Sequence, residues 1–170
     1  AKVVSFDADK VKSMPGVKGV VKVGDTAVAV IAETYWTARN ALAALPVVWE
    51  ETANSKVSSA TIAATLKEGL DAAEAFVGNK AGDAKAAISG AAKKVEAVYY
   101  YPYQHHVTME PMNATALFTP DKCEVWCPTQ NGEAALAAAA DASGLPAAKC
   151  EIYKMLLGGG FGRRGRTDYV

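Results

Sequence analysis

The middle of the chain limits what it can fold into, because residues 51–94 lack the side chains that build a core. Alanine, serine, glycine, lysine and aspartate dominate this segment, and Phe76 is its one aromatic residue. So little apolar volume cannot bury enough surface to offset the conformational entropy lost on folding. The segment predicts a surface helix over residues 59–75 followed by an irregular linker, with a separate folded unit on each side.

Residues 1–52 alternate between strand and helix signals. Three Val-rich runs predict short strands at residues 3–6, 17–23 and 27–32. Asp9 is placed to cap a short helical turn, and Thr34 to cap a helix over residues 35–45. A further strand is expected over residues 47–50. The pattern is typical of a small α/β unit.

Residues 95–170 contain the signals of a second sheet. The expected strands cover residues 95–101, 114–118, 124–126 and 150–156. Residues 119–122 form a turn that would join the second and third of these strands as a hairpin. Residues 133–143 are Ala-rich and helical, and Gly144 is placed to end that helix. The predicted fold class is α+β, with residues 53–94 as a helix and linker between the two units.

The last predicted strand runs into a glycine loop, residues 158–162, in which four of five residues are glycine. Such backbone can take positive φ and can approach a flat or anionic ligand through its own N–H groups. An irregular turn without a ligand is the other interpretation. Residues 160–165 also match the dinucleotide pattern GxGxxG, but the sequence does not predict the helix that this pattern requires.

Three arginines follow the loop, at positions 163, 164 and 166. They add positive charge that suits a phosphate or pyrophosphate group. A solvated face that pairs with Asp168 is the alternative interpretation.

Four polar residues outside the loop are further candidates. Gln130 lies where a strand ends and a helix begins, so its amide either caps the helix or projects into a cleft. Glu110 is a candidate acid or base, although a hydrogen-bonded carboxylate is the commoner use. His105 and His106 are adjacent, so in extended chain they face opposite ways and cannot share a metal.

Composition excludes several classes of function. The 18 Lys and Arg residues balance the 18 Asp and Glu residues, so no net field draws the chain to nucleic acid or to an anionic membrane. No apolar run approaches the roughly 20 residues that span a bilayer, so direct membrane insertion is not expected. Cys123 and Cys127 would lie about 13 Å apart along one strand, too far for a disulfide.

Three segments, taken together, carry a family resemblance. They are YPYQHHVTMEPMN at residues 101–113, VWCPTQ at 125–130 and LGGGFGRR at 157–164. In order and spacing they resemble the large subunit of molybdenum hydroxylases, the xanthine and aldehyde oxidoreductase superfamily, and especially the isoquinoline 1-oxidoreductase beta-subunit type. Residues 1–52 resemble, more loosely, the α/β hammerhead domain of that family. The resemblance implies a hammerhead-like α/β unit followed by the start of a molybdopterin-binding domain at residues 95–170.

This resemblance implies an oxidoreductase that hydroxylates an aldehyde or N-heteroaromatic substrate at a molybdenum–pterin centre, with water as the oxygen source. In the family, the matching glutamine hydrogen-bonds to the oxo group of the metal, and the matching glycine loop lies along the cofactor. The implied cofactor contacts are Gln130, Gly158, Gly159, Gly160, Phe161, Gly162 and Arg163.

The resemblance also implies a small [2Fe–2S] partner subunit and a bacterial, periplasmic location. The general base of the family is a glutamate far beyond the matched segments, so no catalytic residue is assigned here. We therefore expect a fragment that is inactive alone, that purifies without molybdenum and that self-associates through an exposed sheet edge. The alternative, from another functional class, is a noncatalytic anion- or nucleotide-binding module that uses the glycine loop and its arginines.

Overall fold

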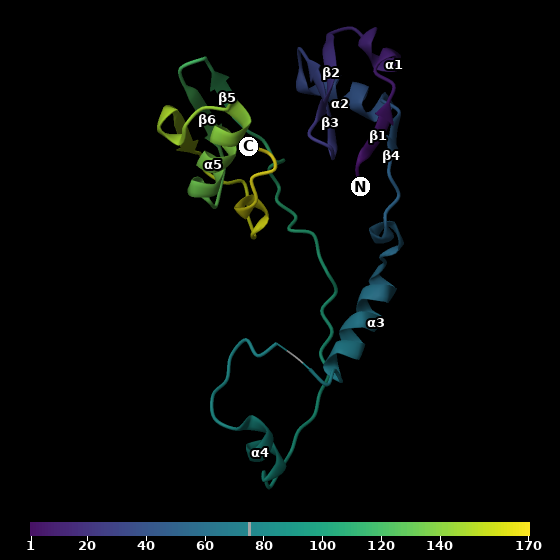
Figure 1. The fold of residues 1–170 in the computed structure, drawn as a ribbon, viewed down its shortest axis with the longest axis vertical. Helices are drawn as coiled ribbons and strands as arrows, with labels where there is room; N and C mark the ends of the chain where they lie inside the picture. The colour runs from purple at the N-terminus through teal and green to yellow at the C-terminus, as the bar shows by residue number, and fades with distance from the viewer. Residues whose placement is uncertain (75) are drawn as a thin grey trace. The chain divides into compact units, whose positions relative to one another are not determined.

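The computed structural model describes residues 1–74 and 76–170, which form two units, Ala1–Val98 and Tyr99–Val170 (Figure 1). The first unit contains β1 (Val3–Phe6), α1 (Asp9–Lys12), β2 (Val17–Val23), β3 (Ala27–Ala32), α2 (Tyr35–Ala44), β4 (Val47–Trp49), the 3₁₀ turn η1 (Ala53–Lys56), α3 (Ser59–Leu70) and α4 (Ala84–Ser89). The second contains β5 (Thr115–Phe118), β6 (Cys123–Cys127), α5 (Gly132–Ser143), η2 (Ala147–Lys149), β7 (Cys150–Lys154) and η3 (Arg163–Gly165). These elements confirm the α+β class. Within the described residues, no helix has the length and apolar character to cross a membrane.

In the first unit, two antiparallel strand pairs and two helices enclose a small core. β1 pairs with β4, and β2 pairs with β3. Val11 of α1 and Ala41 of α2 are fully buried in this core, together with Leu45. The alanine lets α2 approach the strands closely, so a short helix suffices to cover them.

One of the two helix caps that the sequence predicts in the first unit is confirmed. The Thr34 hydroxyl accepts a hydrogen bond from Thr37 N at 3.1 Å, which confirms Thr34 as the cap of α2. The cap predicted at Asp9 is wrong, because α1 begins at Asp9 and Ala8 holds the cap position. The carboxylate of Asp7 instead accepts from Asp9 N at 3.2 Å.

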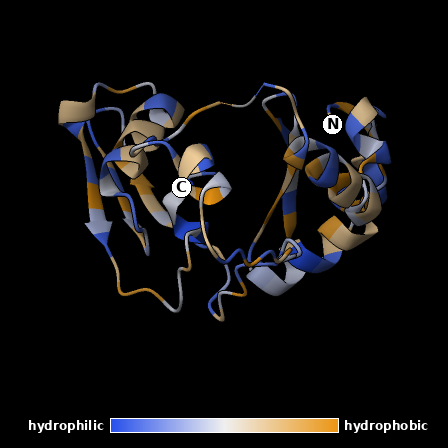
Figure 2. Ribbon diagram, turned by 90° about the horizontal axis from the view of Figure 1, so that it is seen from below, coloured by the Kyte–Doolittle hydropathy of each residue, from blue (hydrophilic) through white to orange (hydrophobic). Residues whose placement is uncertain are grey.

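The second unit is a three-stranded sheet in the order β5-β6-β7, with α5 on one face. β5 and β6 form the expected antiparallel hairpin, whereas β6 and β7 are parallel. Cys123, Val125 and Cys127 alternate along β6 and pack against Ala135 and Ala139 of α5. Figure 2 shows the pale hydrophobic colour of such Ala-rich helices beside strands that alternate between hydrophobic and hydrophilic. Cys123, Cys127 and Cys150 are free thiols.

The α5 helix and its flanking strand differ slightly from the predicted bounds. Asn131 caps the helix by accepting from Ala134 N at 3.1 Å, so α5 begins one residue earlier than expected. Gly144 ends it with a φ of 70°, the left-handed conformation in which glycine is favoured. β7 ends at Lys154 rather than at residue 156.

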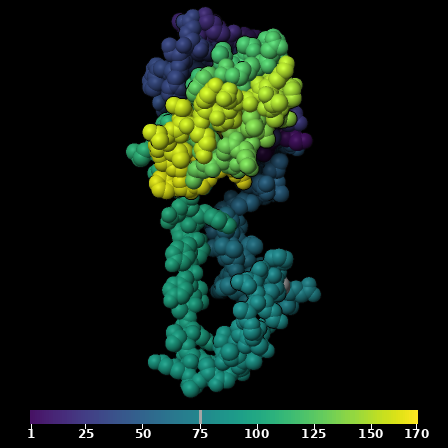
Figure 3. Space-filling view, turned by 90° about the vertical axis from the view of Figure 1, so that its left-hand side faces the viewer, coloured from purple at the N-terminus to yellow at the C-terminus, as the bar shows by residue number. Residues whose placement is uncertain are grey.

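The middle of the chain is exposed, and it differs most from the sequence expectation. Residue 75, where the predicted helix was to end, lies outside the described residues, and α3 ends at Leu70 without a buried side chain. α4 was not predicted. The strand predicted over residues 95–101 is wrong: this stretch is exposed and has no strand partner among the described residues. Figure 3 shows the chain between α4 and residue 98 as a single extended run.

Candidate functional site

The candidate site lies at the edge of the second unit's sheet where two parallel strands end. Residues 128–131 follow β6, and residues 155–164 follow β7. Because β6 and β7 are parallel neighbours, their carboxyl ends meet at the same edge. The ladder continues one step past the strands, since Met155 N donates to Cys127 O at 3.1 Å. Sheet topology therefore brings Gln130 and the glycine loop together.

Gln130 is held at its side chain by the glycine loop and at its backbone by Arg164, which follows the loop. Its backbone N donates to Arg164 O at 3.1 Å, and its side-chain Oε1 accepts from Gly162 N at 3.1 Å. The cap interpretation is therefore wrong for Gln130, because the neighbouring Asn131 caps α5. Since an N–H needs an acceptor, the amide oxygen faces Gly162, and Nε2 carries the two N–H donors of the amide. No hydrogen-bond partner for Nε2 occurs in residues 1–74 and 76–170.

The glycine loop needs its small residues for two different reasons. Gly159 and Gly162 have φ values of 97° and 90°, and Phe161 takes the same left-handed region at 53°. Gly158 and Gly160 are needed because of close approach instead. A Cβ added at Gly158 would overlap Glu110 Cβ, and one added at Gly160 would lie 2.7 Å from Gln130 Oε1.

The loop offers unpaired donors. In the part of the chain that the structure describes, the backbone N–H groups of Gly159, Gly160 and Phe161 donate to no oxygen. We call these three amides and Gln130 Nε2 the donor cluster. The Phe161 side chain is 74% exposed beside them. A set of donors next to an aromatic ring suits a flat ligand that is rich in hydrogen-bond acceptors.

Two of the three arginines after the loop are already paired, so they do not provide free positive charge. Arg163 binds Asp168 through two parallel hydrogen bonds of 2.8 Å each, which confirms the pairing interpretation. This guanidinium holds the pKa of the Asp168 carboxyl below its usual range. Arg164 has no exposed surface at all. Arg163, a predicted cofactor contact, stays a prediction.

An ion pair that the sequence did not predict joins Glu110 and Arg164. Arg164 Nη2 lies 2.7 Å from Glu110 Oε2, although the two residues are 54 positions apart. Donation from Gly158 N lowers the pKa of the Glu110 carboxyl, and Asn113 and Arg164 add to this effect while burial opposes it. Glu110 is thus a hydrogen-bonded carboxylate rather than an evident acid or base. No spacing rule could have paired two residues so far apart.

The histidines do not form a metal site. His105 and His106 line an open pocket of about 290 Å³ with Thr108, Met112 and Arg163. Across the described ranges, no group of three or more His, Cys, Asp or Glu side chains could hold a metal ion.

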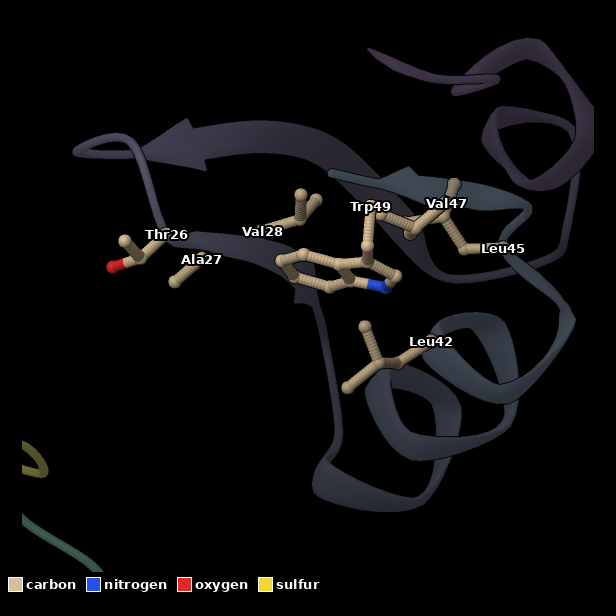
Figure 4. A pocket seen from close by; sticks show the side chains of 7 residues that line it. All are labelled: Thr26, Ala27, Val28, Leu42, Leu45, Val47 and Trp49. Carbon is tan, nitrogen blue, oxygen red and sulfur yellow. The ribbon is translucent and has the colours of Figure 1, made fainter. Parts of the chain in front are cut away.

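A groove of about 480 Å³ in the first unit is a second concave feature (Figure 4). The Trp49 indole lies across it, with Val28 on one side and Leu42 on the other. Thr26 contributes the one side-chain hydroxyl of this lining. An apolar groove without acid, base or cation has no catalytic apparatus of its own.

Comparison with known proteins identifies a family and a curated relative. A family model described as "Molybdopterin cofactor-binding domain" matches residues 69–170. A nicotinate dehydrogenase subunit of Pseudomonas putida is 28% identical over 165 residues, which cover 97% of this chain and 14% of that protein. The chain thus spans about a seventh of the length of this curated relative.

Two crystal structures share the fold. Quinoline 2-oxidoreductase from Pseudomonas putida 86 matches with a TM-score of 0.67 and 19% identity, over 96% of this chain and 26% of that one. The Cu,Mo-CO dehydrogenase in its carbon monoxide reduced state matches with a TM-score of 0.59 and 17% identity, over 99% of this chain and 28% of that one.

Proposed function

The chain belongs to the molybdopterin cofactor-binding domain family, and we propose that Gln130 and the glycine loop hold part of a molybdenum–pterin cofactor in a longer oxidoreductase subunit. The donor cluster is the observation that carries this proposal. The three backbone amides belong to the loop, and Gln130 Nε2 lies against it. None of these donors has an acceptor among the described residues.

The residues present fit such a cofactor. A pterin and the oxo group of a molybdenum centre present acceptors, and the donor cluster presents N–H groups. The close packing of Gly160 on Gln130 keeps the amide in place, because any side chain at position 160 would displace it. Gln130 Nε2 is therefore positioned as a hydrogen-bond donor, and the loop amides as further donors along the ligand.

The whole protein's reaction is the second part of the proposal. When bound, the cofactor supplies a two-electron oxidation in which water provides the oxygen. We propose an aldehyde or N-heteroaromatic substrate, which is hydroxylated, and a small [2Fe–2S] subunit that takes up the electrons. The names of two similar proteins, a nicotinate dehydrogenase and a quinoline 2-oxidoreductase, support the N-heteroaromatic class.

The structure disfavours the alternative anion- or nucleotide-binding module. Arg163 is engaged by Asp168, and Arg164 is buried, so two of the three arginines are not available to a phosphate. The three-residue turn η3 follows the loop, whereas a dinucleotide site needs a helix N-terminus at that place.

Metal analysis and turnover of the complete subunit with its partners test this function. We expect molybdenum and pterin to co-purify with the protein, and we expect a dye acceptor to be reduced in the presence of N-heteroaromatic substrates or aldehydes. Titration with nucleotides serves as the contrasting measurement. A complete subunit that binds nucleotide and contains neither molybdenum nor pterin would overturn the proposal.

A further inference from the structure

Arg164 is buried in a polar setting that pairs its guanidinium with acceptors from three segments. Nε donates to Gly159 O at 2.9 Å, and Nη1 donates to Pro128 O at 3.2 Å. Nη2 donates to Glu110 O at 2.9 Å and to Glu110 Oε2 at 2.7 Å. Burial of a guanidinium is costly unless its donors are paired, so this arrangement requires the three segments to stay in place around it.

Glu110 holds the first residue of the glycine loop from two sides. Its backbone N donates to Gly158 O at 3.0 Å, and its Oε2 accepts from Gly158 N at 3.0 Å. The overlap that any side chain at Gly158 would make with Glu110 shows how close this contact is. The same carboxylate oxygen also supplies the negative charge that faces Arg164. One residue therefore fixes the loop entrance and neutralises the buried cation.

The backbone of Arg164 extends this bracing to Gln130. Arg164 O accepts from Gln130 N at 3.1 Å and from the Thr129 hydroxyl at 3.2 Å. Thr129 is itself buried. Gln130 Oε1 in turn accepts from Gly162 N. Gln130 is thus held at its backbone by the residue that also holds Gly159, and at its side chain by the loop itself.

We propose that Glu110 and Arg164 are positioning residues that preset the glycine loop and the Gln130 amide in the conformation that receives the cofactor. Arg164 is buried and the Glu110 side chain is 34% exposed. An ion pair that takes a charge out of water contributes little net stability when compared with apolar replacements, so a structural contribution alone is a weak reason for this pair. What the pair does provide is a fixed position for the loop. One guanidinium bond holds Gly159 O, and two others hold Glu110, which itself binds Gly158 N. This inference rests on the proposed function for the identity of the ligand, but the preset conformation belongs to the chain itself.

Amide hydrogen exchange on the 170-residue chain, followed by NMR, tests the preset conformation without any cofactor. The variants are Glu110→Gln, which removes the charge while it keeps the shape, and Arg164→Lys, which keeps the charge while it removes the fork of donors. We expect both to lower the protection of the Gly158 and Gly162 amides by about tenfold or more, while the Val125 amide of β6 keeps its protection. Arg166→Lys, an exposed arginine two residues away, is the matched control and should leave every value unchanged.

Two results would overturn the inference. The first is unchanged protection of Gly158 and Gly162 in Glu110→Gln, which would show that the pair does not hold the loop. The second is an equal loss of protection in the loop and in β6, which would reveal a merely structural role. If Arg164→Lys fails to fold, Glu110→Gln decides the matter.

The complete subunit provides the second readout. Glu110→Gln should lower its pterin content, and the molecules that still hold cofactor should show reduced kcat with little change in KM. Wild-type pterin content and kcat in this variant would contradict positioning. A wild-type subunit without molybdenum or pterin would instead contradict the proposed function. The hydrogen-exchange result would still decide whether the pair presets the loop.

Discussion

The side-chain amide of Gln130 offers both an acceptor and a donor. Its oxygen accepts the Gly162 N–H and so helps to fix the loop, while its nitrogen belongs to the donor cluster. These two contributions can be separated by substitution, because a glutamate keeps an acceptor for Gly162 and loses the Nε2 donor.

Substitution of Gln130 in the complete subunit should therefore separate loop bracing from ligand contact. We expect Gln130→Ala and Gln130→Glu both to lower kcat by about 10- to 100-fold, equivalent to about 1–3 kcal/mol, with the fold intact. Steady-state kinetics, corrected for molybdenum content, measure this effect. An unchanged kcat in Gln130→Glu at full molybdenum occupancy would show that the Nε2 donor makes no contribution to the reaction.

The Glu110 carboxylate makes the stability of the folded chain depend on pH. Its pKa is lowered from 4.5, chiefly by the N–H of Gly158, so its stabilising contribution is complete above about pH 4.5 and is lost as the pH falls through the lower, folded-state value. We expect Glu110→Gln to show a smaller loss of unfolding free energy than the wild type between about pH 7 and pH 3. Urea unfolding at each pH measures the difference. An equal loss of unfolding free energy in the two proteins as the pH falls would mean that the Glu110 charge contributes nothing to the folded state.

The caps of α3 and α5 are chemically alike but differ in what their helices bury. α5 places Ala135 and Ala139 in the core of the second unit, whereas α3 buries none of its residues. Asn131→Ala should therefore destabilise the second unit by about 1 kcal/mol. Ser58→Ala, the matched change at the cap of α3, should leave that unfolding transition where it was. Urea unfolding followed by the NMR amide signals of β6 measures both, and equal shifts would contradict the assignment of α5 as the core helix.

Several elements with local signals agree with the sequence, whereas the strand expected over residues 95–101, which needs a partner, does not form. The cap at Thr34, the hairpin of β5 and β6 and the stop at Gly144 are set by neighbouring residues, so their patterns suffice. Residues 95–101 have strong β propensity, yet a strand also needs a neighbour for its backbone groups, and the described residues provide none. α4 is short and Ala-rich, and Asp83 as its cap was the signal available.

The first of the chain's two units ends in an exposed stretch, residues 76–98, which limited proteolysis can test. We expect trypsin to cut first after Lys80, Lys93 or Lys94, where the backbone is exposed and outside regular structure. Mass spectrometry of the first products identifies the sites. First cuts within β5 to β7 would contradict this account of the fold. The domain boundaries expected at residues 52 and 94 stay predictions.

The site, which the whole fold assembles, could be predicted only in part from the sequence. The resemblance implied Gln130 and the loop residues as one group, and the parallel pairing of β6 and β7 explains why they meet. The Glu110–Arg164 pair was missed, because contacts across 54 residues follow from the assembled fold and not from local spacing. Positive φ was expected of the loop generally, whereas Gly158 and Gly160 are needed for close packing instead.

The pterin content of the complete subunit with Gly160→Val tests the central claim, that the loop and Gln130 hold the cofactor, most directly. A valine at position 160 would collide with the Gln130 amide and occupy the space beside the donor cluster. Gly165→Val is the matched control, because a Cβ at Gly165 meets no atom within 4 Å. The account predicts clear loss of pterin per protein in Gly160→Val and wild-type content in the control. Wild-type pterin content in Gly160→Val would contradict it.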